Sequence, residues 1–278
     1  LQHLQYEEEV RVKTRWVEEN LRRIGGIDLP VTGLASPSPL RYRNKAQFPV
    51  GMGPDGPICG FYAGRSHRIV PCEDCLLQPE VFSGICREIL DFVRERGISV
   101  YSEETGKGLL RHLYLRRAET TGQIMVCLVV PRPHLPHQEE LVPRLQAACL
   151  AVSTILLNIN SKATNVILGP EQKVLWGSGL LEDSLCGVGV ELSPLSFYQV
   201  NHAAAQLLYR EAARMAQLTG REVLLDLYCG AGTIGLSMAS QVSQLIGVEI
   251  VPQAVENARR NAREARITNA RFLCADAG

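Results

Sequence analysis

The stretch Val223-Leu-Leu-Asp-Leu-Tyr-Cys-Gly-Ala-Gly-Thr-Ile-Gly235 decides the fold of the second half of this chain. Residues 222–227 are mostly apolar and predict a buried strand, and a helix is expected over 234–240. The glycines between them let the backbone of the connecting turn approach a ligand closely. A strand that opens through glycines into a helix is typical of a nucleotide-type cofactor site.

The same alternation continues on both sides of this turn. A helix capped by Asn201 is expected to run to 217, and strands over 245–249 and 271–273 flank a helix over 252–265. Alternating strands and helices predict a parallel, doubly wound sheet of the α/β class. Its ligand lies beyond the carboxyl ends of the strands, where Asp226, Glu249 and Asp276 stand.

Two cofactors compete for this turn. The spacing Gly230-x-Gly232-x-x-Gly235 satisfies the dinucleotide fingerprint, and Glu249 could bind ribose hydroxyls, as in an NAD-dependent oxidoreductase. However, Asp226 precedes the first glycine by four residues, where its carboxylate repels a pyrophosphate and attracts the ammonium group of S-adenosylmethionine (SAM). These residues favour a SAM site. Two alternative interpretations remain: an NAD site, and a turn whose glycines serve only to pack the helix against the strand.

The part of the chain before Ser193 has a different pattern. A helix is expected over 6–24, with glutamates in its first turn and Gly25-Gly26 as its stop. Strands are then expected over 41–50, 58–62, 110–117, 123–130, 154–158, 173–176 and 187–192, with helices over 79–96 and 138–152. The domains expected are an N-terminal helix at 1–28 that packs on the α/β domain, a central α+β domain at 38–190, and the first half of the α/β domain at 193–278.

Composition narrows the class of protein. The chain has 278 residues, 29 basic and 29 acidic side chains and 46% hydrophobic residues, which indicates a folded, soluble protein of two domains and excludes a disordered one. No apolar run is long enough to span a membrane and no secretory signal is present, so a cytoplasmic location is expected. Nine scattered cysteines indicate reduced thiols.

The charge is unevenly distributed along the chain. The stretch from Pro39 to Arg68 contains five basic residues and one acidic residue. This excess of positive charge predicts either a phosphate-binding surface or a solvated hairpin.

Several separated segments carry a family resemblance. They are Arg41-Tyr-Arg-Asn-Lys-Ala-Gln47, Gly60-Phe-Tyr with Arg65-Ser-His67 and Cys75, Ser193-Pro-Leu-Ser-Phe-Tyr-Gln-Val-Asn201, Asp226-Leu-Tyr-Cys-Gly230 and Gly247-Val-Glu-Ile-Val-Pro252. Together they resemble the RNA uracil-5-methyltransferases of the RumA/TrmA type, most closely the branch that modifies 23S ribosomal RNA. The resemblance implies a partial class I SAM methyltransferase sheet, Rossmann-like, preceded by an α+β central domain.

The resemblance also implies a cofactor site and an RNA-binding face. Contacts to S-adenosyl-L-methionine are expected for Gln199, Asp226, Tyr228, Gly230, Gly232, Thr233, Glu249 and Asp276. The expected partner is 23S rRNA, bound through Arg41, Arg43, Lys45, Arg65 and Arg68, with Tyr42 and Tyr62. A target uridine in folded RNA must leave its stack to be reached, and basic and aromatic side chains hold such a loop.

In the family reaction a cysteine thiolate adds to uracil carbon-6, carbon-5 takes the methyl group, and a base removes the carbon-5 proton. The resemblance places that cysteine and base beyond Gly278. Cys229 is then part of the binding turn, and Cys274 a packing residue. The chain is expected to be an inactive fragment whose sheet has an open edge and a largely uncovered apolar face, which favours poor solubility or self-association. A non-catalytic RNA-binding module is the remaining alternative.

An iron–sulfur cluster is a further implication of the resemblance. Members of the ribosomal RNA branch hold a [4Fe-4S] cluster on four cysteines. Cys75 matches the last of them, and the other three are expected before Leu1. Cys72 lies outside the family pattern, and a single Cys-x-x-Cys pair cannot complete a four-thiolate site.

Overall fold

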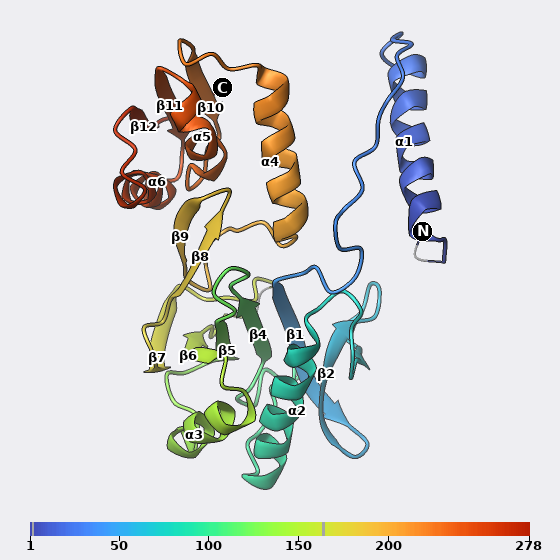
Figure 1. Ribbon diagram of the computed structural model, residues 1–278. Helices are drawn as coiled ribbons and strands as arrows, with labels where there is room; N and C mark the ends of the chain where they lie inside the picture. Colours follow the sequence, from blue (N-terminus) through green and yellow to red (C-terminus); the bar gives the residue numbers. More distant parts are fainter. Residues whose placement is uncertain (2, 163–164) are drawn as a thin grey trace. The chain divides into compact units, whose positions relative to one another are not determined.

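The computed structural model describes residues 1, 3–162 and 165–278, which divide into two units, Leu1–Leu40 and Arg41–Gly278 (Figure 1). The first unit contains helix α1 (Tyr6–Arg23), with three glutamates in its first turn and two arginines in its last, so both ends complement the helix dipole. The predicted helix is confirmed. The packing of residues 1–28 on the α/β domain stays a prediction.

A seven-stranded sheet forms the first part of the second unit. Its strands are β1 (Lys45–Gly53), β2 (Gly56–Tyr62), β3 (Ile69–Pro71), β4 (His112–Arg117), β5 (Ile124–Val130), β6 (Val152–Ile159) and β7 (Glu171–Trp176). They lie in the order β3-β2-β1-β4-β5-β6-β7, and only β5 and β6 pair in parallel. The sequence pattern did not predict β3, whose three residues are too few to show an alternation.

Both faces of this sheet are covered near its centre. Helices α2 (Glu80–Glu95) and α3 (Gln138–Ala148) bury their apolar stripes against one face. The hairpin of β8 (Leu181–Leu185) and β9 (Val188–Leu192) packs on the other face, together with α4 (His202–Ala216). Because both faces are covered, every residue of β5 is buried, which explains its uninterrupted apolar sequence. The strand β8 was not predicted.

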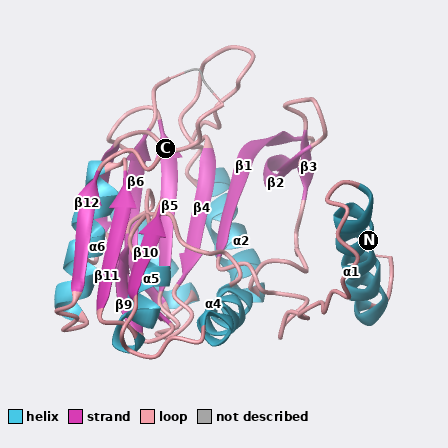
Figure 2. Cartoon of the chain, turned by 90° about the horizontal axis from the view of Figure 1, so that it is seen from above, coloured by secondary structure: helices cyan, strands magenta, loops and turns pink. Residues whose placement is uncertain are grey.

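The second sheet is the predicted α/β element. Strands β10 (Val223–Leu227), β11 (Gln244–Glu249) and β12 (Ala270–Cys274) pair in parallel in this order. Helix α5 (Thr233–Met238), a 3-10 turn η1 (Ala239–Gln241) and α6 (Pro252–Glu264) connect them, and Figure 2 shows α6 alongside β11 and β12. The expected fold class is therefore confirmed. The boundary expected near residue 190 falls inside one compact unit, so the division of this unit into two domains stays a prediction.

One expectation about this sheet is wrong. The strand at 222–227 was predicted to be buried, but Val223, Leu225 and Leu227 are 57%, 55% and 44% exposed. The helices α5 and α6 cover only the face that carries Leu224 and Asp226, so the alternate side chains of β10 remain in solvent. None of the described helices has the length and apolarity needed to cross a membrane.

Candidate cofactor site

The glycines of the β10–α5 turn meet different constraints. A Cβ on Gly232, at a φ of +77°, would lie 2.9 Å from the ring of Phe272, and one on Gly235 would lie 2.6 Å from Leu245. Gly230, at a φ of +56°, has open space where a Cβ would stand. Packing therefore accounts for Gly232 and Gly235, whereas at Gly230 the backbone is left accessible to a ligand.

Asp226, the penultimate residue of β10, carries a partly buried carboxylate. Its Oδ2 accepts a hydrogen bond from the backbone N–H of Gly235 at 2.9 Å. Burial raises the pKa of Asp226, and the Gly235 hydrogen bond opposes this shift. Among the described residues no cationic side chain is bonded to it. A buried carboxylate without a positive partner suits an ammonium group and disfavours a pyrophosphate, so this geometry favours SAM over NAD.

Glu249 ends β11 beside the same turn. Its Oε2 accepts from the Gly230 N–H at 3.0 Å, and its Oε1 accepts from the Val251 N–H at 2.9 Å. Each carboxylate oxygen has a second lone pair, so two hydroxyl donors of a ribose can still be accepted. The two backbone hydrogen bonds fix the carboxylate against the turn and hold it ready for such a ligand.

Tyr228 and Asp276, two further predicted cofactor residues, both lie near Gly278. Tyr228 has a left-handed backbone, with φ +59°, and its side chain is exposed. An ideal Cβ built on Gly278 would lie 4.0 Å from the Tyr228 hydroxyl and 3.6 Å from Asp276 Oδ1. Thr233 is the first residue of α5, so it follows the turn directly. The structure thus gathers seven of the eight predicted cofactor residues at one end of this sheet.

Gln199 is the eighth, and no described contact joins it to the turn. The central sheet holds its backbone instead: Asn44 donates from Nδ2 to the Gln199 carbonyl and from its backbone N–H to the Val200 carbonyl, both at 2.9 Å. Arg43 forms an isolated bridge with Asn201, whose side chain caps α4 by accepting from the Ala204 N–H. The predicted cap is therefore confirmed.

Arg116 holds the start of the same segment and was missed in the sequence. Its guanidinium donates to the carbonyls of Ser193 at 2.9 Å and Ser196 at 2.8 Å, and its side chain is buried. It bonds no carboxylate within the described residues. An arginine inside an apolar strand is the signal that could have identified it, because a buried charge needs specific partners.

Asn261 supports the glycine turn and was also missed. It is buried on α6, where the apolar stripe predicts a hydrophobic residue, and its Nδ2 donates to the Ala231 carbonyl at 3.0 Å. A lone asparagine on an apolar helix face was the available signal.

The two cysteines beside this site, Cys229 and Cys274, differ in burial. Burial, reinforced by the charges of Asp226 and Glu249, raises the pKa of Cys229 to about 12. A thiol held neutral is a poor nucleophile, which agrees with a place in the binding turn. Cys274 is exposed at the end of β12, so its expected packing role is wrong, because no helix covers that end of the strand.

The five predicted RNA-binding cations have different surroundings. Arg41 donates to both carboxylate oxygens of Asp74, at 2.5 and 2.7 Å, and to the carbonyl of Cys75 at 2.8 Å, so it holds that loop. Lys45 is half-buried, and burial with the charges of Arg116 and Arg43 lowers its pKa. Arg65 and Arg68 are exposed on the loop between β2 and β3.

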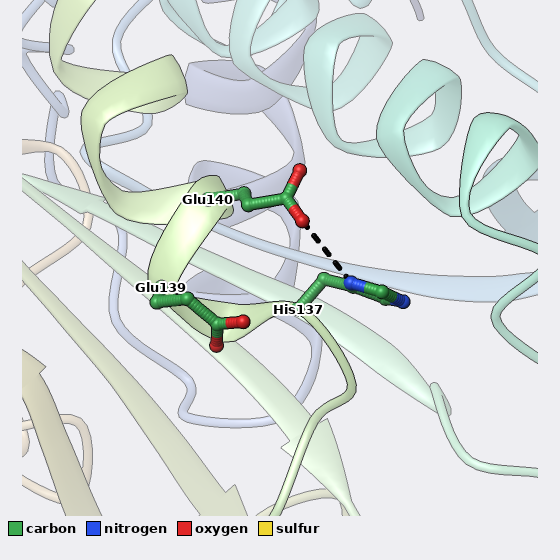
Figure 3. A group of neighbouring side chains, drawn as sticks. All are labelled: His137, Glu139 and Glu140. Carbon is green, nitrogen blue, oxygen red and sulfur yellow. Dashed lines mark hydrogen bonds and ion pairs between the residues drawn. The ribbon is translucent and has the colours of Figure 1, made fainter.

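Cys75 is the one expected iron–sulfur ligand within this chain, and the cluster itself stays a prediction. One trio within the described residues could direct ligand atoms to a common metal ion, namely His137, Glu139 and Glu140 (Figure 3). Glu140 already pairs with His137 at 3.1 Å and with Arg96, so this group is an ordinary surface ion pair. The Cys59 and Cys75 thiols lie close enough to Cys72 to add to the burial that raises its pKa. No three of these thiols lie within 4.8 Å of one another in the described part of the chain, and we derive no step through a cluster.

A parallel sheet whose first strand opens through a glycine turn, with acids closing the first two strands, defines the Rossmann-like class of SAM methyltransferases. The comparisons agree: residues 218–278 match the family model for a methyltransferase domain. The whole chain is similar to uncharacterized RNA methyltransferases of Halalkalibacterium halodurans, at 43% identity over 100% of this chain, and of Clostridium tetani, at 41% over 98%. The chain spans about 60% of the length of these relatives.

A solved structure shows the same fold. The tRNA (uracil-54, C5)-methyltransferase of Pyrococcus abyssi, in complex with S-adenosyl-L-homocysteine, superimposes with a TM-score of 0.80 and 26% identity over 99% of this chain and 64% of that one. The chain is thus a relative of RNA methyltransferases, with a uracil-C5 methyltransferase as a structural neighbour. These matches do not single out the ribosomal RNA branch.

Proposed function

We propose that the full-length protein containing this chain is a SAM-dependent RNA methyltransferase that methylates carbon-5 of a uridine. One observation carries the proposal: Asp226 and Glu249 stand at the ends of neighbouring parallel strands, each hydrogen-bonded to the glycine turn. Similarity to RNA methyltransferases over the whole chain, and to a uracil-C5 enzyme in structure, supports the choice of RNA and of uracil.

Each residue of the site has a role in this proposal. Asp226 accepts the ammonium group of the methionine moiety, Glu249 accepts the ribose hydroxyls, and Asp276 accepts the adenine amino group. Gly230 admits the ligand to the backbone. Tyr228, Gly232, Thr233 and Gln199 complete the pocket. Asn261 keeps the turn in place through Ala231.

The proposed RNA is 23S ribosomal RNA, bound by the central domain at residues 38–190. Arg43, Lys45, Arg65 and Arg68, with Tyr42 and Tyr62, form the proposed contact face, and Arg41 braces it through Asp74. The exposure of Arg65 and Arg68 supports their place on this face. The resemblance, rather than the matches to known proteins, carries the choice of ribosomal RNA.

SAM supplies an electrophilic methyl group when bound. The residues of this chain bind and orient it. A cysteine thiolate adds to uracil carbon-6, carbon-5 takes the methyl group with release of S-adenosylhomocysteine, and a base then removes the carbon-5 proton as the thiolate is expelled. We assign neither group to a described residue, because the Cys229 thiol is held neutral. The task of the chain in this reaction is to present the donor and to hold the RNA.

Isothermal titration of the full-length protein with SAM, S-adenosylhomocysteine and NADH tests the cofactor. We expect SAM and S-adenosylhomocysteine to bind the wild type and neither to bind Asp226→Asn. Binding of NADH alone would overturn the proposal.

Methyl transfer from labelled SAM then tests the substrate. The RNAs compared are 23S rRNA, transfer RNA and 23S rRNA that contains 5-fluorouridine. A label on any position other than uracil carbon-5 contradicts the proposed reaction, and methylation of transfer RNA alone contradicts the proposed partner.

A further inference from the structure

A cavity of about 1150 Å³ opens in the central domain, at the end of the sheet where β4 begins. Gly51, Tyr62, Tyr101, Glu103 and His112 are among the residues that line it. Antiparallel pairing sets Lys45 opposite Arg116 and Pro49 opposite His112. The cavity therefore begins four residues, roughly 13 Å along the strands, from the end that holds the Gln199 segment.

His112 is the least satisfied polar group in this cavity. Its side chain is only 5% exposed, and within the described part of the chain its Nδ1 has no hydrogen-bond partner. Burial, together with the charge of Arg111, lowers its pKa to about 4, so the ring is neutral at physiological pH. A buried polar atom without a hydrogen bond destabilises the folded protein. A ligand that forms a hydrogen bond with this atom would explain why it is present.

Aromatic side chains stand around this imidazole. The ring of Tyr62 makes edge contacts with His67 and His112, at centroid distances of 5.6 and 6.4 Å. More than a third of Tyr62 remains exposed. Such a cluster offers a flat apolar surface beside a hydrogen-bonding atom, which is the combination that unstacked bases of RNA use.

Two arginines, Arg68 and Arg111, and two glutamates, Glu103 and Glu104, line the cavity. Arg111 is buried and already donates to the carbonyls of Asn160 and Lys162 and to Glu103. Its charge is therefore neutralised within the chain. Arg68 lines the cavity, is exposed, and makes no ion pair with another described residue. A nucleotide has this distribution of charge, with a neutral base and an anionic phosphate.

We propose that this cavity binds an unstacked nucleobase of the RNA substrate, at a site separate from the target uridine. Tyr62 stacks on the base, His112 Nδ1 forms a hydrogen bond with its edge, and Arg68 contacts the adjoining phosphate. The inference rests on the proposed RNA methyltransferase function and adds a second point at which the RNA is held. A base anchored here restricts which loops can also deliver a uridine to the cofactor.

The test measures binding of fluorescently labelled single-stranded oligouridine and oligoadenosine to the full-length protein. Tyr62→Leu removes the ring but keeps apolar volume, and Phe61→Leu is its matched control, since Phe61 and Tyr62 are neighbours on β2 with 39% and 38% exposure. We expect Tyr62→Leu to weaken binding about tenfold, the loss typical of one stacked base, without changing its salt dependence. Phe61→Leu and Tyr62→Phe should bind like the wild type. His112→Gln should alter the ratio of the two affinities.

Equal affinities of Tyr62→Leu and Phe61→Leu for the oligonucleotides would overturn the inference. So would a loss of SAM binding in Tyr62→Leu as large as its loss of oligonucleotide binding. Ultraviolet cross-linking of oligouridine to the wild-type protein gives a readout that needs no variant. Cross-links should map to the peptide that contains Tyr62 and His67, and their absence there contradicts the site. Failure of the proposed function shows separately, as a wild-type protein that neither binds SAM nor methylates RNA.

Discussion

The side-chain amide of Asn44 donates to the backbone carbonyl of Gln199 at 2.9 Å, across 155 positions of sequence. Asn44 lies immediately before β1 of the central sheet and is buried. Gln199 belongs to the segment that precedes α4 and the α/β sheet. This hydrogen bond, with those of Arg116, makes the central domain a support for a residue proposed to bind SAM.

Replacing Asn44 by Leu tests this support. The change keeps the side-chain volume but leaves the Gln199 carbonyl without its donor, so the free energy of unfolding should fall by about 1–3 kcal/mol. SAM should bind more weakly as the segment loosens. Urea denaturation and isothermal titration of the full-length protein measure both effects. The control is Gln47→Leu on β1, three residues further along the chain; equal behaviour of the two variants would contradict the role of Asn44.

Arg116→Met removes both donors to the Ser193–Ser196 turn. Two buried carbonyls lose charge-assisted hydrogen bonds, each worth about 1.5–3 kcal/mol, so the variant should be clearly less stable than Arg117→Met. Because Asn44 and Arg116 hold one segment, the double variant with Asn44→Leu should depart from additivity by about 0.5–3 kcal/mol. Strict additivity in a double-mutant cycle would show that the two residues act independently.

Alanine substitutions separate the two kinds of glycine in the turn. Gly230→Ala introduces only the strain of a left-handed backbone, so it should lower the free energy of unfolding by about 1–2 kcal/mol. Gly232→Ala adds a clash with the Phe272 ring and should cost about 1–3 kcal/mol more. Chemical denaturation of both variants gives the difference. If Gly232→Ala is no less stable than Gly230→Ala, Phe272 does not constrain the turn.

Glu249→Gln should weaken SAM binding while the protein stays folded. The amide NH2 replaces one oxygen that now accepts from Gly230 or Val251, and it cannot accept from a ribose hydroxyl. We expect a loss of about 1.5–3 kcal/mol in binding free energy by isothermal titration. Glu256→Gln, an exposed change on α6, is the control. Unchanged affinity in Glu249→Gln would exclude the carboxylate from the site.

Stability should depend on pH through His112. The folded protein holds this ring neutral, with a pKa of about 4 against 6.5 when unfolded. Only the unfolded state takes up a proton between these values, so stability is complete above about pH 6.5 and is lost as the pH falls toward 4. Between pH 7 and 5 the wild type should lose about 2 kcal/mol that His112→Gln keeps. Parallel losses in urea denaturation of both proteins would show that His112 does not titrate on unfolding.

The α/β sheet could be predicted because its signals are local. The glycines, the acid ahead of them and the alternation of apolar segments with helices are all read over short distances. The strand β3 escaped prediction because its three residues are too few to show the alternation of a strand, and β8 because it is buried only by packing on the distant central sheet. An apolar strand does not reveal which of its side chains the helices cover, so the exposure of Val223, Leu225 and Leu227 could not be assigned residue by residue.

The sequence alone determined the class of this protein, because the turn from Val223 to Gly235 encodes its own backbone shape and places Asp226 and Glu249 at strand ends. Only the tertiary structure decided what lies around that turn. It joined Asn44 and Arg116 to the segment of Gln199, held the Cys229 thiol neutral and buried the His112 ring with its Nδ1 unpaired among the described residues. Those properties arise from contacts between residues far apart in the chain, which no local pattern can specify.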